Sequence, residues 1–164
     1  MKAKTKMFVG GAAVLVAFGA AFATPIVNLA SPLLSVGNQT ADIHKRGTFE
    51  NNGEEQFSAS LRTDGPSTIT IQDAAYSTGG QNGWHSHPGI VIVTVITGSI
   101  QWYDENCRST SYKAGDSWVE GSQLHAFKVL GTTGAHVSAV FITAQGQAVR
   151  TDRPAPACAN GLGL

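Results

Sequence analysis

The sequence has little charge and little cysteine. Lys, Arg, Asp and Glu together make up 13% of its 164 residues, and it contains only two cysteines. Beyond the lysines of residues 2–6, no segment concentrates Lys and Arg, which argues against a nucleic-acid partner. The sequence also lacks a phosphate-binding Gly-Lys-Ser/Thr loop, a dinucleotide fingerprint in a strand–helix context and a Gly-x-Ser-x-Gly turn. Glycine is abundant, with 19 residues, and this composition is typical of a compact β domain with many turns.

The first 23 residues are predicted to be an export signal. A basic start with three lysines in six residues precedes an uninterrupted run of small apolar side chains over residues 7–23. That run ends in Ala-Phe-Ala at Ala23, the small-x-small pattern that signal peptidase recognises. The alternative is an uncleaved anchor, although the run is shorter than the roughly 20 residues that comfortably span a bilayer. We therefore expect a secreted or extracytoplasmic protein, or one anchored in the membrane at its N-terminus.

The two cysteines, Cys107 and Cys158, fit an oxidising compartment. A disulfide between them would tie the C-terminal tail to the loop that follows Asp104. The alternative is two unpaired thiols. A metal site built from the cysteines is disfavoured because their spacing is far from a C-x-x-C pattern.

Alternation of apolar and polar side chains predicts a series of short strands. Phe57, Ala59 and Leu61 alternate with polar neighbours, as in a half-buried strand. Residues 90–96 form an almost pure β-branched run, which suits a strand buried on both faces. Further strands are expected at residues 68–72, 84–87, 99–103, 111–113, 117–120, 125–129 and 136–143. About eight short strands separated by turns predict an all-β sandwich or barrel of the jelly-roll type.

Three histidines form the most informative pattern. His85 and His87 stand at i and i+2, so on a strand both side chains point to the same face. Imidazole nitrogens are good ligands for mid-row divalent metals. His125, from a neighbouring strand, would complete a three-nitrogen face that leaves positions open for water or substrate. The alternative is a group of histidines that hydrogen-bond to one another and to water.

The segments around these histidines resemble the two motifs of the cupin family. Residues 83–89, Gly-Trp-His-Ser-His-Pro-Gly, are followed by a β-branched strand that ends at Gly98, and they look like the first motif. Residues 115–120, Gly-Asp-Ser-Trp-Val-Glu, look like the second. The resemblance runs from about Gly47 to Gly146. Together with the exported start and the cysteine pair, the chain looks like a group of small secreted bacterial cupin-domain proteins.

The resemblance implies a single double-stranded β-helix barrel with a metal held inside by His85, His87 and His125. Two departures from the family pattern stand out. The first motif usually carries a glutamate four residues after its second histidine, where this chain has Val91. The second usually has proline and glycine before its histidine, where this chain has Gly-Ser-Gln at 121–123. Three of the four usual ligands therefore remain, and the uncompensated charge of the ion should attract an anionic or oxygen-rich ligand.

The expected cofactor is a divalent metal ion, and the ligand types fit Fe, Mn, Ni, Zn or Cu equally. Val91 would extend an apolar pocket beside the site, with Trp84 as a further apolar wall. Tyr103 would supply a hydroxyl, and Gln123 would orient the third histidine or a bound water. Glu120 is the nearby acid of the second motif, and alternation leaves open whether its side chain points inward or to the rim.

We divide the chain into a signal peptide (1–23), an extended N-terminal arm or linker (24–46), a cupin barrel (47–150) and a C-terminal tail (151–164). The expected function is that of an exported metal-binding cupin that acts on or binds a small molecule, as a metal-dependent oxygenase, lyase or isomerase. The alternatives are a noncatalytic binding or sensing module and a structural barrel with a vestigial site. The apolar strand at 90–96 also suggests a homodimer, with cover from the N-terminal arm as the alternative.

Overall fold

The computed structural model describes residues 24–30 and 33–164. The predicted signal peptide lies outside the described residues. Within them, no helix is long and apolar enough to cross a membrane.

The described part of the chain forms thirteen strands and one short 3₁₀ helix, at Ala157–Ala159. The strands are β1 (Val27–Ala30), β2 (Leu33–Gln39), β3 (Ile43–Asn51), β4 (Glu54–Thr63), β5 (Ser67–Gln81), β6 (His85–Ser86), β7 (Ile90–Thr97), β8 (Ser99–Asp104), β9 (Ser109–Lys113), β10 (Ser117–Glu120), β11 (His125–Val129), β12 (Ala135–Ala144) and β13 (Thr151–Asp152).

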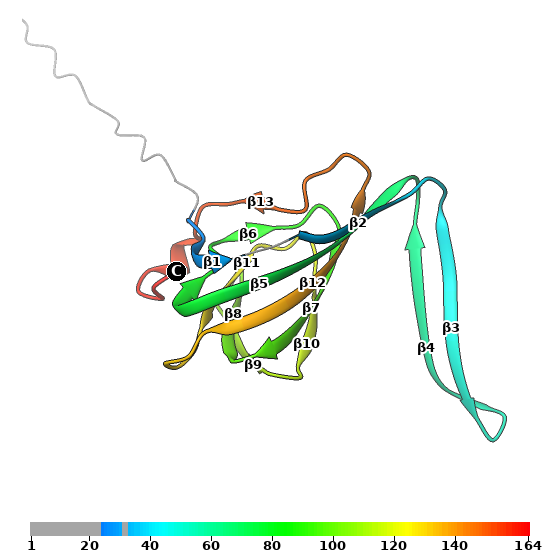
Figure 1. Cartoon of the computed structure of the whole chain (residues 1–164), viewed down its shortest axis with the longest axis horizontal. Coiled ribbons are helices and arrows are strands. Elements are labelled where there is room, and N and C mark those ends of the chain that lie inside the picture. Colours follow the sequence, from blue (N-terminus) through cyan, green and yellow to red (C-terminus); the bar gives the residue numbers. More distant parts are fainter. Residues whose placement is uncertain (1–23, 31–32) are drawn as a thin grey trace, which may run out of the picture.

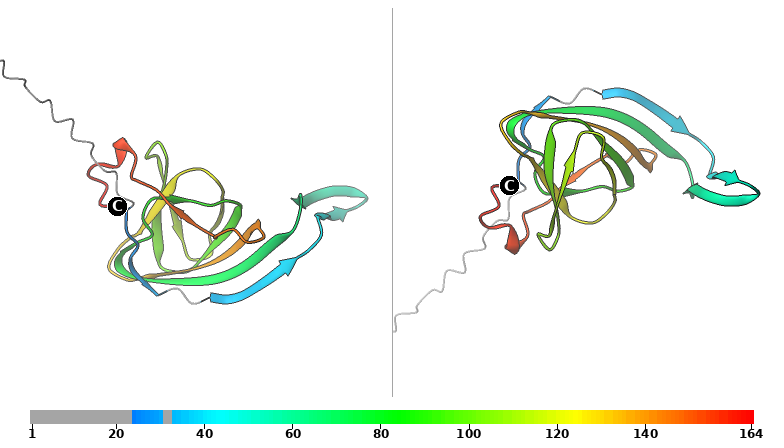
Figure 2. Two further views of the ribbon diagram at one scale, coloured as in Figure 1. Left: turned by 90° about the horizontal axis from the view of Figure 1, so that it is seen from above. Right: turned by 90° about the horizontal axis from the view of Figure 1, so that it is seen from below.

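Eleven of these strands form one antiparallel sheet that curls into a nearly closed barrel (Figures 1 and 2). The strand order is β10-β7-β12-β5-β11-β6-β13, with β1 and β2 paired to β5, β8 paired to β11, and β9 paired to β8. The all-β barrel expected from the sequence is thus confirmed. Residues 27–39, expected to be an extended arm or linker, form β1 and β2 and belong to this same sheet.

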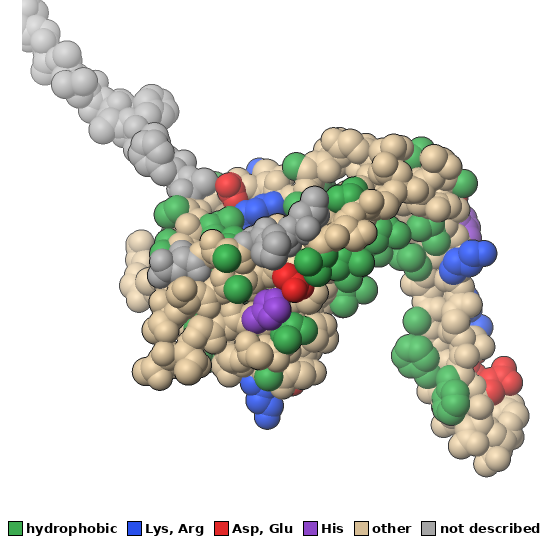
Figure 3. Space-filling model, in the orientation of Figure 1, with side chains coloured by type: hydrophobic (Ala, Val, Ile, Leu, Met, Phe, Trp, Pro, Cys, Tyr) green, Lys and Arg blue, Asp and Glu red, His purple; other side chains and the backbone are tan. Residues whose placement is uncertain are grey.

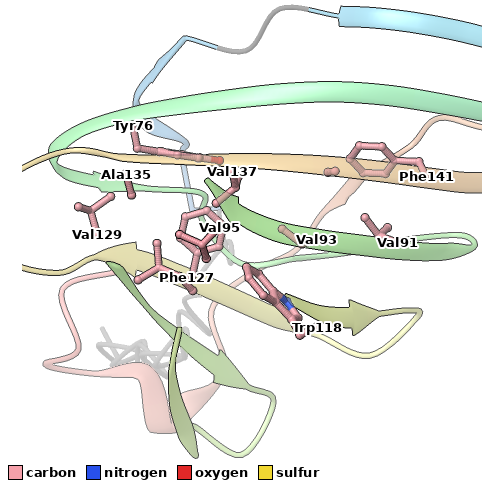
Figure 4. Close-up of a cluster of buried hydrophobic side chains, with 12 residues drawn as sticks. Tyr76, Val91, Val93, Val95, Trp118, Phe127, Val129, Ala135, Val137 and Phe141 are labelled. Atoms are coloured by element: carbon pink, nitrogen blue, oxygen red, sulfur yellow. The ribbon is translucent and has the colours of Figure 1, made fainter. Parts of the chain in front are cut away.

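The barrel interior is filled by inward-facing side chains of β5, β7, β10, β11 and β12 (Figure 4). On β7 the alternation is regular, with Val91, Val93 and Val95 buried. The neighbouring Ile90 and Ile92 are 49% and 44% exposed. The prediction that this strand is buried on both faces is therefore wrong for its outer face. A run of β-branched residues favours a strand with apolar side chains on both faces. It does not indicate whether other residues of the same chain pack against both of these faces.

Strands β3 and β4 form a separate two-stranded sheet that projects from the barrel (Figures 1 and 2). Phe57 lies in this hairpin and is 62% exposed. The expectation that residues 57–61 form a half-buried strand is wrong in this structure, although the alternation itself is real. The pattern shows that the strand has an apolar face, and the packing of the whole molecule decides whether that face is covered.

A disulfide joins Cys107, in the turn after β8, to Cys158, in the 3₁₀ helix. The bond fixes the C-terminal tail beside a second buried cluster that contains Trp84, Tyr103 and Ala159. The expected disulfide is therefore present, and it closes a loop over a sequence separation of 51 residues.

Reduction of this bond should destabilise the barrel. Closing a loop of this size contributes on the order of 4 kcal/mol through the entropy of the unfolded chain, so dithiothreitol should lower Tm by roughly 10 °C for a domain of this length. Thermal unfolding followed by circular dichroism measures the shift. The Cys107→Ser/Cys158→Ser variant should unfold at the lower temperature with and without reductant. An unchanged Tm on complete reduction would show that the bond stabilises nothing.

Candidate metal centre

Four buried side chains converge at one end of the barrel interior: His85, His87, Glu120 and His125. Each offers one ligand atom, and these atoms lie within 4.8 Å of one another. The Nε2 atom of His87 lies 3.2 Å from Oε2 of Glu120 and 3.2 Å from Nε2 of His125. The Nε2 atom of His125 lies 3.3 Å from the same carboxylate oxygen. The structure thus brings together the three histidines singled out from the sequence and adds a carboxylate to them.

Strand pairing places these side chains. His85 on β6 is the direct antiparallel partner of His125 on β11, which brings the two ring centroids to 4.3 Å. His87 follows two residues after His85, and its backbone N–H donates to the carbonyl of Gly121. That bond ties the first histidine segment to the loop between Glu120 and His125. The i, i+2 spacing therefore brings His85 and His87 into one cluster, and backbone hydrogen bonds fix the position of this segment relative to His125.

The histidines are held in one tautomer by backbone carbonyls. The Nδ1 atoms of His85, His87 and His125 lie 2.8, 2.7 and 2.8 Å from the carbonyl oxygens of Gly83, Val149 and Gln123, respectively. A carbonyl oxygen can only accept, so each Nδ1 must carry the proton. In the neutral ring the Nε2 lone pair is then free and points into the cluster. This is the arrangement in which outer hydrogen bonds orient metal-binding imidazoles.

Glu120 is the fourth member of the cluster, and it corrects an expectation from the sequence. Glu120 on β10 is the direct cross-strand partner of Val91 on β7, the position where the cupin motif usually carries its glutamate. Both side chains are buried. The carboxylate is therefore supplied from the opposite position on the neighbouring strand. The expectation that only neutral imidazoles surround the site is wrong, because Glu120 offsets one unit of positive charge.

Two tryptophans hold the Glu120 carboxylate in place. Its Oε1 atom accepts hydrogen bonds from Nε1 of Trp102, at 2.9 Å, and from Nε1 of Trp118, at 2.8 Å. The indole of Trp102 also stacks on the His125 ring. Because both indole donors bind one oxygen, the other oxygen, Oε2, faces the histidines. The buried carboxylate is thus oriented as firmly as the imidazoles are.

The environment favours the metal-binding protonation states. Burial by itself raises the pKa of the Glu120 carboxyl, but the adjacent imidazoles of His125 and His87 and the hydrogen bond from Trp118 bring that pKa well below its usual value. Burial lowers the pKa of His85 to about 2, assisted by the charges of His125 and Arg150. Near neutral pH, Glu120 is therefore charged and His85 is neutral, and these are the forms that coordinate a metal.

The donor set fits a divalent cation. Three Nε2 lone pairs and one carboxylate oxygen meet in a buried space, and every Nδ1 proton is already committed to a carbonyl. Acceptors brought together in this way repel one another unless a proton or a cation lies between them. A three-nitrogen, one-oxygen set is well suited to first-row divalent metals and leaves coordination positions open.

A cavity of about 240 Å³ opens from this cluster into the barrel. Its walls are mostly apolar and include Val91, Val93, Phe127 and Phe141, and β1 contributes Leu29. Its polar side chains include His85, His87 and Glu120 of the cluster, together with Tyr76 and Arg150. Burial raises the pKa of the Tyr76 hydroxyl, so this group stays protonated. The cavity therefore has mostly apolar walls and a group of charged side chains.

The other residues proposed from the sequence occupy varied positions. Val91 lines the cavity as expected. Gln123 does orient a histidine, but through its backbone carbonyl, because that oxygen accepts from Nδ1 of His125. Trp84 and Tyr103 lie in the second buried cluster and are not among the residues that line the cavity. Their expected roles as a pocket wall and a hydroxyl donor are therefore not seen here.

Sequence reasoning missed two residues from the segment between β12 and β13. Val149 supplies the carbonyl that orients His87. Arg150 lines the cavity and donates from Nη2 to the carbonyl of Asn82 at 2.6 Å. Neither residue stands in a motif, so the sequence offers no signal for them. For Glu120 a partial signal exists, since Trp118 and Glu120 stand two apart on one strand and therefore share one face. The spacing does not say that this face points inward.

No family model and no curated protein matches the chain. Among solved structures, the chain is similar to a cupin-2 domain protein from Rhodospirillum rubrum, with a TM-score of 0.51 and 11% identity over 85% of this chain and 73% of that chain. It is also similar to a protein with a double-stranded β-helix domain from Klebsiella pneumoniae, with a TM-score of 0.46 and 25% identity over 52% and 70% of the two chains. A third similar structure is an RmlC-like cupin from Shewanella frigidimarina, with a TM-score of 0.42 and 18% identity over 48% and 68%. The similarity to the cupin-2 domain protein spans most of both chains, and together with the curled antiparallel sheet it shows that the chain has the double-stranded β-helix fold of the cupins.

Proposed function

We propose that His85, His87, Glu120 and His125 hold one divalent metal ion. The observation that carries this proposal is the convergence of three Nε2 atoms and one carboxylate oxygen, with each Nδ1 atom bound to a backbone carbonyl. Such a cluster is stable when a cation occupies its centre, since the four inner atoms are all acceptors.

We further propose that the chain is a metal-dependent enzyme acting on a small anionic molecule with an apolar body. The volume of about 240 Å³ corresponds to roughly eight water molecules at bulk density, which limits the ligand to a small molecule. One carboxylate leaves a divalent ion with a net positive charge, and the guanidinium of Arg150, which pairs through Nε with Asp152, lines the same cavity. A ligand carboxylate would neutralise the net charge of the metal centre and would accept a hydrogen bond from Arg150.

The bound metal would act as a Lewis acid on an oxygen atom of the ligand. Oxygenase, lyase and isomerase chemistry are all compatible with this role. Tyr76, which stays protonated, lines the same cavity and would donate a hydrogen bond or a proton to the bound ligand. Beyond the cluster, Tyr76 and Arg150, the cavity is lined by two more polar side chains, Gln72 and Asn82. This small number of polar groups favours a second candidate, a noncatalytic module that binds or senses the same class of molecule.

We also propose that residues 1–23 direct the chain out of the cytoplasm. The disulfide between Cys107 and Cys158 supports this proposal, because such bonds persist in oxidising compartments. The alternative is that the segment stays attached as a membrane anchor.

The metal proposal is tested by elemental mass spectrometry of untagged protein purified without chelator. We expect close to one transition metal ion per chain. Glu120→Gln and His87→Ala should lower this content at least roughly tenfold, the usual scale for loss of an orienting or coordinating group. His136→Ala and Glu105→Gln are matched controls, because His136 pairs with Asp73 away from the cluster and Glu105 is exposed. Equal metal content in all five proteins would contradict the site.

The ligand class is tested by calorimetric titration of the metal-loaded protein with short-chain monocarboxylates and the corresponding alcohols. We expect carboxylates to bind at least about tenfold more tightly, because an ion pair with Arg150 adds a charge-assisted hydrogen bond. Arg150→Gln should reduce this preference to the part that the net positive charge of the metal centre supplies, and Arg150→Lys should keep more of it. All three proteins should retain the metal. Equal affinity for both ligand series in the wild type would exclude an anionic ligand while leaving the metal proposal standing.

A further inference from the structure

The projecting hairpin, β3 and β4 with their turn (residues 43–63), is amphipathic. Its direct cross-strand partners include Phe49 with Phe57 and, on the same face, Gly47 with Ala59. The opposite face carries polar pairs such as Thr48 with Ser58. Phe49 and Phe57 are 60% and 62% exposed. An isolated two-stranded hairpin is marginally stable at best in water, so a hairpin with one exposed aromatic face indicates a surface made to be covered.

The barrel carries a matching apolar face on the outside of its sheet. Two rows of direct cross-strand partners run across neighbouring strands. The first row crosses β10, β7, β12 and β5, and the second crosses β7, β12 and β5. The residues of this outer apolar face are Val119, Ile92, Val140, Ile71, Ile90, Ile142 and Ile69. Apolar side chains aligned over four strands form a contiguous patch, and such patches mark interaction sites.

The chain's own hairpin does not cover this patch. The base of the hairpin lies beside a hollow lined by Leu61, Pro66, Ile90 and Ile142, and from there the hairpin extends away from the barrel (Figures 1 and 2). Figure 3 shows hydrophobic side chains on the barrel near this base and on the side of the hairpin that faces the barrel. An open space separates the two in that view.

We propose that a second copy of this chain fills this space, in a twofold dimer in which each projecting hairpin packs on the outer apolar face of its partner. One chain carries both complementary surfaces, and a twofold axis satisfies both contacts at once and leaves no free end for further growth. The apolar side of each hairpin, with Phe49, Phe57 and Leu61, would lie on the rows of Ile and Val residues of the other barrel.

The surface available is large enough for a stable dimer. At 60% and 62% exposure, Phe49 and Phe57 together present on the order of 240 Å². The seven partly exposed aliphatic side chains of the outer apolar face add roughly 300 Å² at the area that a buried aliphatic side chain represents. Two reciprocal contacts would therefore bury about 1,000 Å² of apolar surface, which reaches the size required of a specific interface.

Sedimentation velocity over a concentration series tests the proposal. The wild-type chain should sediment with twice the monomer mass. Phe49→Ser/Phe57→Ser on the hairpin and Ile92→Lys on the sheet should each halve the mass, with metal content unchanged because neither site lies in the barrel interior. Thr48→Lys/Ser58→Glu changes the polar face of the same hairpin, and this control should stay dimeric. A wild type that is monomeric at every concentration overturns the proposal, as does a dimer that survives the Phe substitutions.

Mixing the two monomeric variants identifies the contact itself. The Ile92→Lys chain retains an intact hairpin, and the Phe49→Ser/Phe57→Ser chain retains an intact sheet face. Their mixture should therefore associate through one complete hairpin-to-sheet contact. Because this contact buries about half the surface of the wild-type dimer, the heterodimer should be weaker and should form at the upper end of the concentration series, where a fluorescent label on one variant reveals it. If hairpins packed on hairpins or sheets on sheets, mixing the variants would not restore association. That result would overturn the proposed packing of each hairpin on its partner's sheet.

Discussion

The buried carboxylate of Glu120 is the group on which the interior of this barrel depends. Removing a charged group from water costs several kcal/mol unless its hydrogen-bonding capacity is filled. Two indole N–H groups fill one oxygen, and the second oxygen is left to the histidines. That second oxygen lies among other acceptors, so a positive charge is needed to complete the arrangement. The geometry of the protein therefore argues for a cation more strongly than the identity of the ligands alone.

The position of Glu120 also shows how an antiparallel sheet can preserve a site while its sequence motif changes. Val91 and Glu120 are directly opposite on β7 and β10, and both face inward. Side chains at such paired positions stand about 5 Å apart, so a carboxylate on either strand reaches nearly the same space. A motif counted along one strand records a ligand as missing when it has moved to the neighbouring strand.

The sequence predicts the fold and most of the cluster because both follow from local periodicity. The i, i+2 spacing places His85 and His87 on one face, and the β-branched run predicts β7. Periodicity divides a strand into two faces but does not identify the inner one, so the sequence does not place the Glu120 side chain inside the barrel or at its rim. Val149 and Arg150 reach the site from a segment without regular period, and only the folded chain brings them there. The alternation around Phe57 likewise gives that strand one apolar face. A pattern within one strand cannot specify which part of the molecule, or of a partner, packs against that face.

The sequence pattern and the structure of the single chain differ most clearly at the outer face of β7. Residues 90–96 have the composition of a strand covered on both sides, yet Ile90 and Ile92 are about half exposed. The hairpin shows the same disagreement, because its alternation is that of a half-buried strand while Phe49 and Phe57 are open to solvent. Two independent segments thus carry apolar faces that a single chain leaves uncovered. Both faces would be buried if each covered the other between two chains, and the sequence pattern would then agree with the structure at the level of the assembly.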